Sequence, residues 1–145
     1  MNHLIPILLM ACAGAAVALQ PSINARLAQK VGLLESACIS FAVGTVALLL
    51  VLLLSGKGTW KGLSATVWWE WSGGVLGAFF VSVTILAVSR IGTAATMGAA
   101  IAAQLLTGLI LDHFGLFGFQ ESSIDLKRSL GACLLILGAY LVVRR

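Results

Sequence analysis

Charged residues are scarce in this sequence of 145 residues: Asp, Glu, Lys and Arg make up 10% of it, whereas 60% is hydrophobic. A soluble domain of this size carries roughly 25% charged residues. The chain therefore cannot cover a surface that faces water, which excludes a soluble protein. We expect an all-α integral membrane protein of the plasma membrane, which in a bacterium is the inner membrane.

The few charges are also poor evidence for a nucleic-acid partner. The net charge of +4 comes from residues near the ends of apolar stretches. Basic residues at these positions are better explained by contact with anionic membrane lipid than by nucleic-acid binding.

Catalytic and metal-binding patterns are absent. The sequence has no Gly-rich phosphate loop, no His/Asp/Glu spacing for a metal and no Ser-His or Cys-His pair in a plausible cavity. The three cysteines, Cys12, Cys38 and Cys133, stand singly within apolar runs, so we interpret them as small buried thiols. We expect no enzyme, no cofactor and no metal site.

Five apolar stretches are long enough to cross a bilayer, within a single transmembrane domain that spans residues 1–145. The expected helices cover residues 4–25, 33–54, 69–88, 93–111 and 129–143. Only His3 precedes the first stretch as a candidate cation, so we expect a retained helix rather than a signal peptide. Pro21 is expected to kink or end this helix.

Positive charges divide almost evenly between the two sides of the membrane if the five helices alternate. One side receives four of them and the other five: Lys57, Lys61, Lys127 and Arg128 against Arg26, Lys30, Arg90, Arg144 and Arg145. Because Lys and Arg in short loops orient membrane proteins, this balance predicts weak orientation. With an odd number of helices, it indicates an antiparallel homodimer, or a heterodimer with a paralogue.

Small residues recur at four-residue spacing, which allows membrane helices to approach closely. They predict packing faces in the third and fourth helices, at Gly73, Gly77, Ala95, Gly98, Ala99 and Ala102.

Uncharged polar residues at membrane depth are the candidate solute-binding groups: Gln20, Asn24, Ser40 and Gln104. An unpaired amide in hydrocarbon costs several kcal/mol, so these groups need partners. They either bond neighbouring helices or line a wet cavity that binds a small polar solute, and Pro21 beside two of them favours the cavity. We expect Trp69 to guard an entrance.

Several motifs together resemble the YdcZ-like family of small integral membrane proteins, in the drug/metabolite transporter superfamily. The resemblance covers essentially the whole chain. It is carried by residues 19–27 (LQPSINARL), 40–45 (SFAVGT), 73–79 (GGVLGAF) and 111–115 (LDHFG), together with Trp69, the Arg90-Ile91-Gly92 turn and Gln104.

The resemblance implies a half-size transporter: a five-helix bundle that corresponds to one half of a ten-helix inverted-repeat architecture. It supplies neither a substrate nor a catalytic residue. The first helix lacks the carboxylate that small multidrug exporters of the superfamily carry there, which argues against their proton-coupled mechanism. The alternative is a non-transporting membrane protein that assists assembly or regulation.

Overall fold

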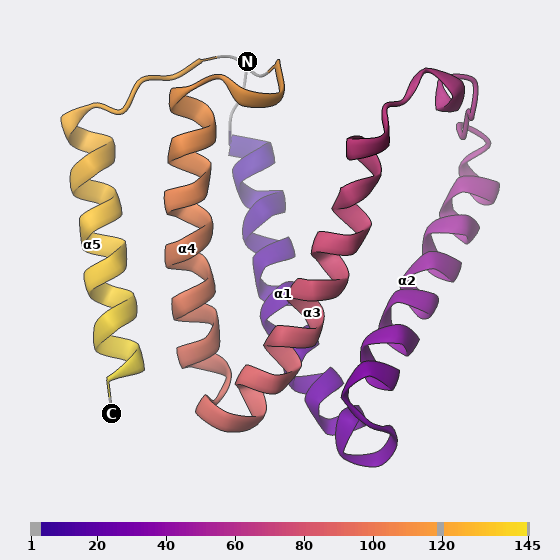
Figure 1. The fold of residues 1–145 in the computed structure, drawn as a ribbon, viewed down its shortest axis with the longest axis horizontal. Helices are drawn as coiled ribbons and strands as arrows, with labels where there is room; N and C mark the ends of the chain where they lie inside the picture. Colours follow the sequence, from indigo (N-terminus) through magenta and orange to yellow (C-terminus); the bar gives the residue numbers. More distant parts are fainter. Residues whose placement is uncertain (1–3, 119–120, 145) are drawn as a thin grey trace. The chain divides into compact units, whose positions relative to one another are not determined.

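Five long helices form the chain in the computed structural model, which describes residues 4–118 and 121–144 (Figure 1). They are α1 (Leu4–Val31), α2 (Leu33–Ser55), α3 (Ser72–Ile91), α4 (Thr93–His113) and α5 (Leu126–Val143). Three 3-10 turns join them: η1 (Leu63–Ala65), η2 (Trp68–Trp71) and η3 (Leu116–Gly118). All five helices are long and apolar enough to cross a membrane, and the described residues contain no strand. The all-α fold with five spanning helices is confirmed.

Helix α1 continues through Pro21 and ends at Val31, six residues beyond the expected end at residue 25. Proline cannot donate the hydrogen bond to the carbonyl of Val17, but membrane helices tolerate this when neighbouring elements cover the site. Pro21 and Asn24 are both buried, so tertiary packing supports the helix at this point. The expectation that Pro21 ends the helix is wrong, and Arg26 and Lys30 lie within α1 rather than in a loop.

Helix α5 begins at Leu126, three residues before the expected start. Asp125 caps it, because its carboxylate accepts a hydrogen bond of 2.7 Å from the backbone N–H of Arg128. The helix has 18 residues and is therefore about 27 Å long, close to the hydrocarbon thickness of ~30 Å. The polar start of α5, which reads as loop in the sequence, supplies the missing turn.

The chain divides into two compact units, Met1–Arg90 and Ile91–Arg145, which we call unit 1 and unit 2. Unit 1 contains the α1–α2 hairpin and α3. Its core joins the three helices through Ala25 of α1, Ala37 of α2, and Val81 and Ile85 of α3. All four are at most 8% exposed. The core residues of α1 and α2, Ala25 and Ala37, lie within seven positions of the turn at Gly32.

Unit 2 is an antiparallel pair of helices, α4 and α5, which lie side by side (Figure 1). The two helices approach closely at Gly98, where an added Cβ would lie 3.6 Å from the Cα of Ala139. A glycine at this point lets one helix rest against the backbone of the other, as small residues do in membrane interfaces.

Two glycine turns of the same construction connect helices. Gly32 joins α1 to α2 with φ 104°, and Gly92, which stands 60 positions later, precedes α4 with φ 82°. In each turn the glycine carbonyl accepts from the N–H four residues on, that of Ser36 at 3.1 Å and that of Thr96 at 3.2 Å. Residues that carry a side chain rarely adopt these φ values, so glycine permits both short connections.

Most of the apolar surface is exposed within the monomer. Large side chains such as Leu8, Leu53 and Leu134 are more than half exposed, as expected for helices that face lipid or a second subunit. The three cysteines are exposed as well, so the expectation of buried thiols is wrong for the monomer. Single apolar residues in a membrane helix do not reveal which face is outward, because lipid and protein are both apolar.

Candidate solute-binding sites

Three of the predicted polar residues meet in unit 1. Gln20 and Asn24 lie one turn apart on α1, and both side-chain amides donate to the Oγ of Ser40 on α2, at 3.4 Å and 3.2 Å respectively. A further bond of 2.8 Å runs from the Oγ of Ser36 to the backbone carbonyl of Asn24. These contacts join two polar residues of α1 to two of α2. We call the four residues the amide cluster: Gln20, Asn24, Ser36 and Ser40.

The amide cluster borders a cavity of about 220 Å³ in unit 1. Its lining comprises Gln20, Ser40, Phe41, Gly44, Thr45 and Leu48. The side-chain oxygens of Gln20 and Asn24 and the O–H of Ser40 have no partner among the described residues. An amide oxygen accepts hydrogen bonds and a serine O–H donates one, so the cluster retains capacity for a polar ligand.

The amide cluster lies within two helices that are long and apolar enough to cross a membrane. Ser40 is seven residues into α2 and therefore about 10 Å from the turn at Gly32. Asn24 is 5% exposed and Ser36 is fully buried. No charged residue lines the cavity. A ligand in this cavity would meet hydrogen-bonding groups and apolar walls rather than charges.

Gln104 lies in unit 2, where it lines a different space. A groove of about 430 Å³ runs between α4 and α5, and we call it the α4–α5 groove. It is bordered by Gln104, Leu105, Gly108, Leu109, Asp112, Arg128, Gly131, Ala132 and Leu135. Gln104 is exposed and has no hydrogen-bond partner among the described residues. Its amide is therefore free to bond an occupant of the groove.

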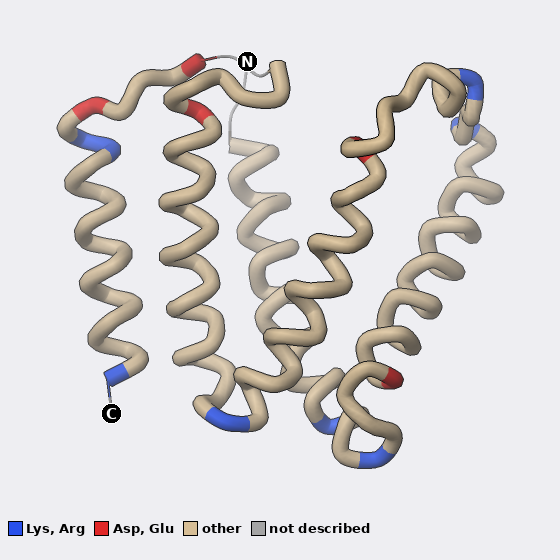
Figure 2. Tube along the Cα trace, in the orientation of Figure 1, with Lys and Arg blue, Asp and Glu red and all other residues tan. Residues whose placement is uncertain are grey.

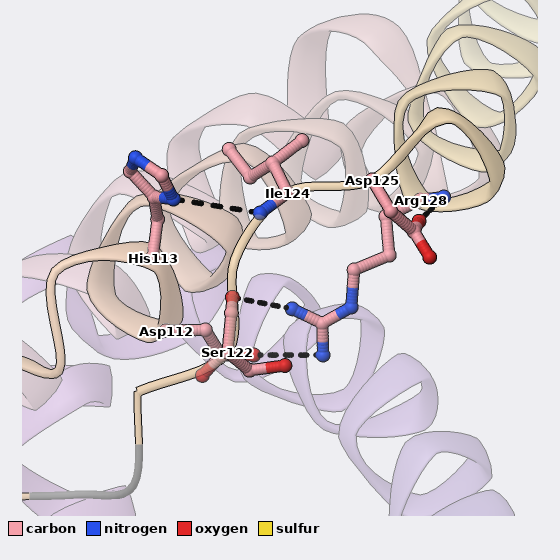
Figure 3. Close-up of polar contacts among 6 residues, drawn as sticks. All are labelled: Asp112, His113, Ser122, Ile124, Asp125 and Arg128. Carbon is pink, nitrogen blue, oxygen red and sulfur yellow. Dashed lines mark hydrogen bonds and ion pairs between the residues drawn. The ribbon is translucent and has the colours of Figure 1, made fainter.

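An ion pair lies at the end of the groove. The guanidinium of Arg128 lies 3.4 Å from the carboxylate of Asp112 and donates a second bond of 3.1 Å to the carbonyl of Ser122 (Figure 3). The loop before α5 is held by the N–H of Ser122, which donates to the backbone carbonyl of Asp112 at 2.8 Å. The N–H of Ile124 donates to Nδ1 of His113 at 3.4 Å. These bonds connect the end of α4 to the start of α5.

Trp69 and the predicted packing residues occupy varied positions. Trp69 lies in η2, is 42% exposed and is not among the residues that line the cavity. A Cβ at Gly77 would lie 3.3 Å from Cζ of Phe41, whereas one at Gly73 would have no neighbour within 4 Å. On α4, Ala95 is buried, Ala102 is half-buried and Ala99 is exposed.

Three of these polar groups were not predicted from the sequence. Ser36 and Asp112 stand at helix ends, where they look like interfacial residues, and Arg128 was counted only as a loop charge. The spacing from Asp112 to Arg128 across a polar loop carries no periodic signal. Their pairing depends on α5 beginning early enough to bring Arg128 into its first turn.

Charged residues lie at or near helix ends in both units, and the middle of each helix is free of them within the described chain (Figure 2). No group of three potential metal ligands is found among the described residues. Both candidate sites are therefore built around uncharged amides at membrane depth, and only the groove adds charge at its end.

Comparison with known proteins places the chain in one family. Residues 5–141 match the profile of the family described as "Putative inner membrane exporter, YdcZ". The chain is also 30% identical to the inner membrane protein YdcZ of Escherichia coli (strain K12) over 148 aligned positions, which cover 100% of this chain and 99% of that protein. No solved structure matches it. The chain is a multi-pass inner membrane protein that belongs to the YdcZ family.

Proposed function

We propose that this protein is half of a secondary transporter, which moves a small solute across the inner membrane as an antiparallel dimer. The candidate path residues are Gln20, Asn24, Ser40 and Gln104, with Trp69 near an opening. Membership in a family described as an exporter supports transport. The solute and the assembly are inferred from the residues of this chain.

The amide cluster carries the proposal. Gln20 and Ser40 of the cluster line a cavity between spanning helices, and Asn24 donates to the same Ser40, with hydrogen-bonding capacity that no other described residue uses. A purely structural cluster would satisfy its own groups, because unpaired polar atoms in hydrocarbon cost several kcal/mol. A wet cavity that admits a polar solute removes that cost.

The topology supports an antiparallel dimer. Five crossings put the two ends of one chain on opposite sides of the membrane, and the Lys and Arg residues split four against five. Two oppositely inserted copies form an inverted repeat, and rocking of one copy against the other exposes the path to each side in turn. In such a dimer the inward-open and outward-open states are nearly equivalent.

Solute flux tests the role of the amide cluster. Proteoliposomes are loaded with a ¹³C-labelled small-molecule extract of E. coli, and released compounds are identified by mass spectrometry. We expect Ser40→Ala to reduce release of the transported compound at least tenfold, because both amides lose their shared acceptor. Ser89→Ala is the matched control, since the Ser89 hydroxyl donates to the Leu86 carbonyl of its own helix.

Equal flux from the wild type and the Ser40→Ala variant, with both proteins folded, would rule out the amide cluster as the solute path. Release of no compound, together with tight binding of another membrane protein, would favour the non-transporting alternative.

A topology reporter fused to the C-terminus tests the assembly. We expect signal on both sides of the membrane. Signal on one side only removes the self-inverted homodimer and leaves a heterodimer with an oppositely oriented paralogue.

A further inference from the structure

The α4–α5 groove has polar groups at two depths and apolar walls between them. Gln104 is 11 residues into the 21-residue α4, so its amide lies near the middle of the helix. Asp112 is eight residues further on, about 12 Å along the axis. Leu105, Leu109 and Leu135 border the space between. A ligand that fits must be polar at its head and apolar in its body.

The charges at the end of the groove are held weakly. Asp112 and Arg128 touch through one contact of 3.4 Å, and their side chains are 51% and 36% exposed. Exposed pairs of this kind contribute only about 0.2–1 kcal/mol. Little stability is therefore lost if a ligand separates them, and each charge then gains a new partner of opposite sign.

The helix ends reinforce this arrangement of charge. Arg128 lies in the first turn of α5, where the helix dipole favours an anion, and Asp112 lies in the last turn of α4, where it favours a cation. A carboxylate at Arg128 can be bound by two parallel hydrogen bonds, which guanidinium groups form readily. The site thus has separate positions for one negative and one positive group.

We propose that the α4–α5 groove binds a small zwitterion with an apolar body, of the amino-acid type. Its carboxylate pairs with Arg128, its ammonium pairs with Asp112, and its body lies against Leu105, Leu109 and Leu135 towards Gln104. The groove volume of about 430 Å³ falls within the usual range for small-molecule pockets, about 300–1,000 Å³. This inference rests on the proposed transport function and names its substrate class.

A phospholipid is the competing occupant, because a zwitterionic headgroup also carries both charges. Its acyl chain would, however, lie against the amide of Gln104 and leave it without a hydrogen bond in hydrocarbon, which is costly. A small solute with water beside it leaves the amide hydrated. The groove therefore suits a free zwitterion better than a lipid tail.

Binding measurements with three matched probes test the proposal. The full-length protein is placed in phosphatidylglycerol nanodiscs and titrated with leucine, with leucinamide, which lacks the carboxylate, and with 4-methylpentanoate, which lacks the ammonium. We expect leucine to bind at least tenfold more tightly than either analogue. Added phosphatidylethanolamine should not compete with leucine.

Two variants test which residue binds each charged group of the ligand. Arg128→Met should weaken leucine binding at least tenfold and change leucinamide binding less than twofold. Asp112→Asn should weaken leucine binding to the same degree and spare 4-methylpentanoate. The control Lys127→Met removes a neighbouring cation that does not line the groove, and should leave leucine binding unchanged.

Four results would overturn the proposal: no binding of leucine, equal binding of the three probes, an equal loss of all probes in a variant, or displacement of leucine by phosphatidylethanolamine. Failure here is distinguishable from failure of the transport proposal. If labelled compounds still cross the membrane in the flux assay, transport stands and only the substrate class is wrong.

Discussion

The amides of unit 1 bond to a shared serine, whereas the amide of Gln104 in unit 2 stands alone along the α4–α5 groove. In unit 1 the amides of Gln20 and Asn24 share Ser40, and the cluster is built into the contact between two helices. In unit 2, Gln104 has no partner among the described residues. The amide cluster therefore also holds two helices together, whereas Gln104 does not.

This contrast explains why one feature can serve structure and function at once. The amide cluster forms three internal hydrogen bonds and leaves the side-chain oxygens of Gln20 and Asn24 and the O–H of Ser40 for a ligand. The polar groups of the α4–α5 groove bond to one another only weakly, since the ion pair between Asp112 and Arg128 is exposed and long. Substitutions in unit 1 should therefore affect folding and flux together, whereas those in the groove should affect ligand binding and flux with little effect on folding.

The largest expected difference is between Asn24→Leu and Gln104→Leu. Asn24→Leu removes a buried amide that donates to Ser40, so we expect the free energy of unfolding to fall by about 1–3 kcal/mol and flux to fall at least tenfold. Gln104→Leu breaks no bond within the described chain, so its stability should stay within about 0.5 kcal/mol. Thermal unfolding in detergent micelles measures both. Equal destabilisation by the two substitutions would show that the amide cluster holds the helices together no more than Gln104 does.

The next difference concerns how closely the helices of each unit approach. Gly98→Leu should destabilise unit 2 by about 1–3 kcal/mol, because the new side chain meets the backbone of Ala139, which cannot rotate away. Gly77→Leu in unit 1 should cost less, because the side chain of Phe41 can move.

Gly14→Leu is the control for both substitutions, since nothing lies within 4 Å of its Cβ position. The measurement is again the midpoint of thermal unfolding. A variant at Gly14 that is as unstable as the one at Gly98 would show that the added volume, and not the helix contact, causes the loss.

The smallest effect is expected at the ion pair. Asp112→Asn should lower the free energy of unfolding by at most about 1 kcal/mol, because the pair is exposed and forms a single contact. Raising NaCl from about 0.05 M to 0.5 M should remove most of that difference by screening. A larger or salt-independent loss would indicate that Asp112 holds the loop before α5 rather than a weak pair.

The helices were largely predictable from sequence because each is a continuous apolar run. The expected ranges 33–54 and 93–111 differ by one or two residues from α2 and α4. The main error was the prediction that the helix ends at Pro21. The local effect of proline on the backbone can be predicted from sequence, but the packing that lets α1 continue past Pro21 cannot. The candidate residues Gln20, Asn24 and Ser40 were found because polar side chains stand out against hydrocarbon, and the helix period puts the first two on one face.

The pairing of helices could not be predicted in the same way. Gln104 was grouped with the other amides because of its depth, yet it lines a groove between α4 and α5 with Asp112 and Arg128. The sequence alone determined a membrane protein, its five helices and the polar residues within them, because composition and length decide whether a segment enters a bilayer. Only the tertiary structure decided which polar groups meet. Both lipid and protein are apolar, so hydropathy does not mark the faces that pack, and contact depends on where small residues and turns bring two helices together.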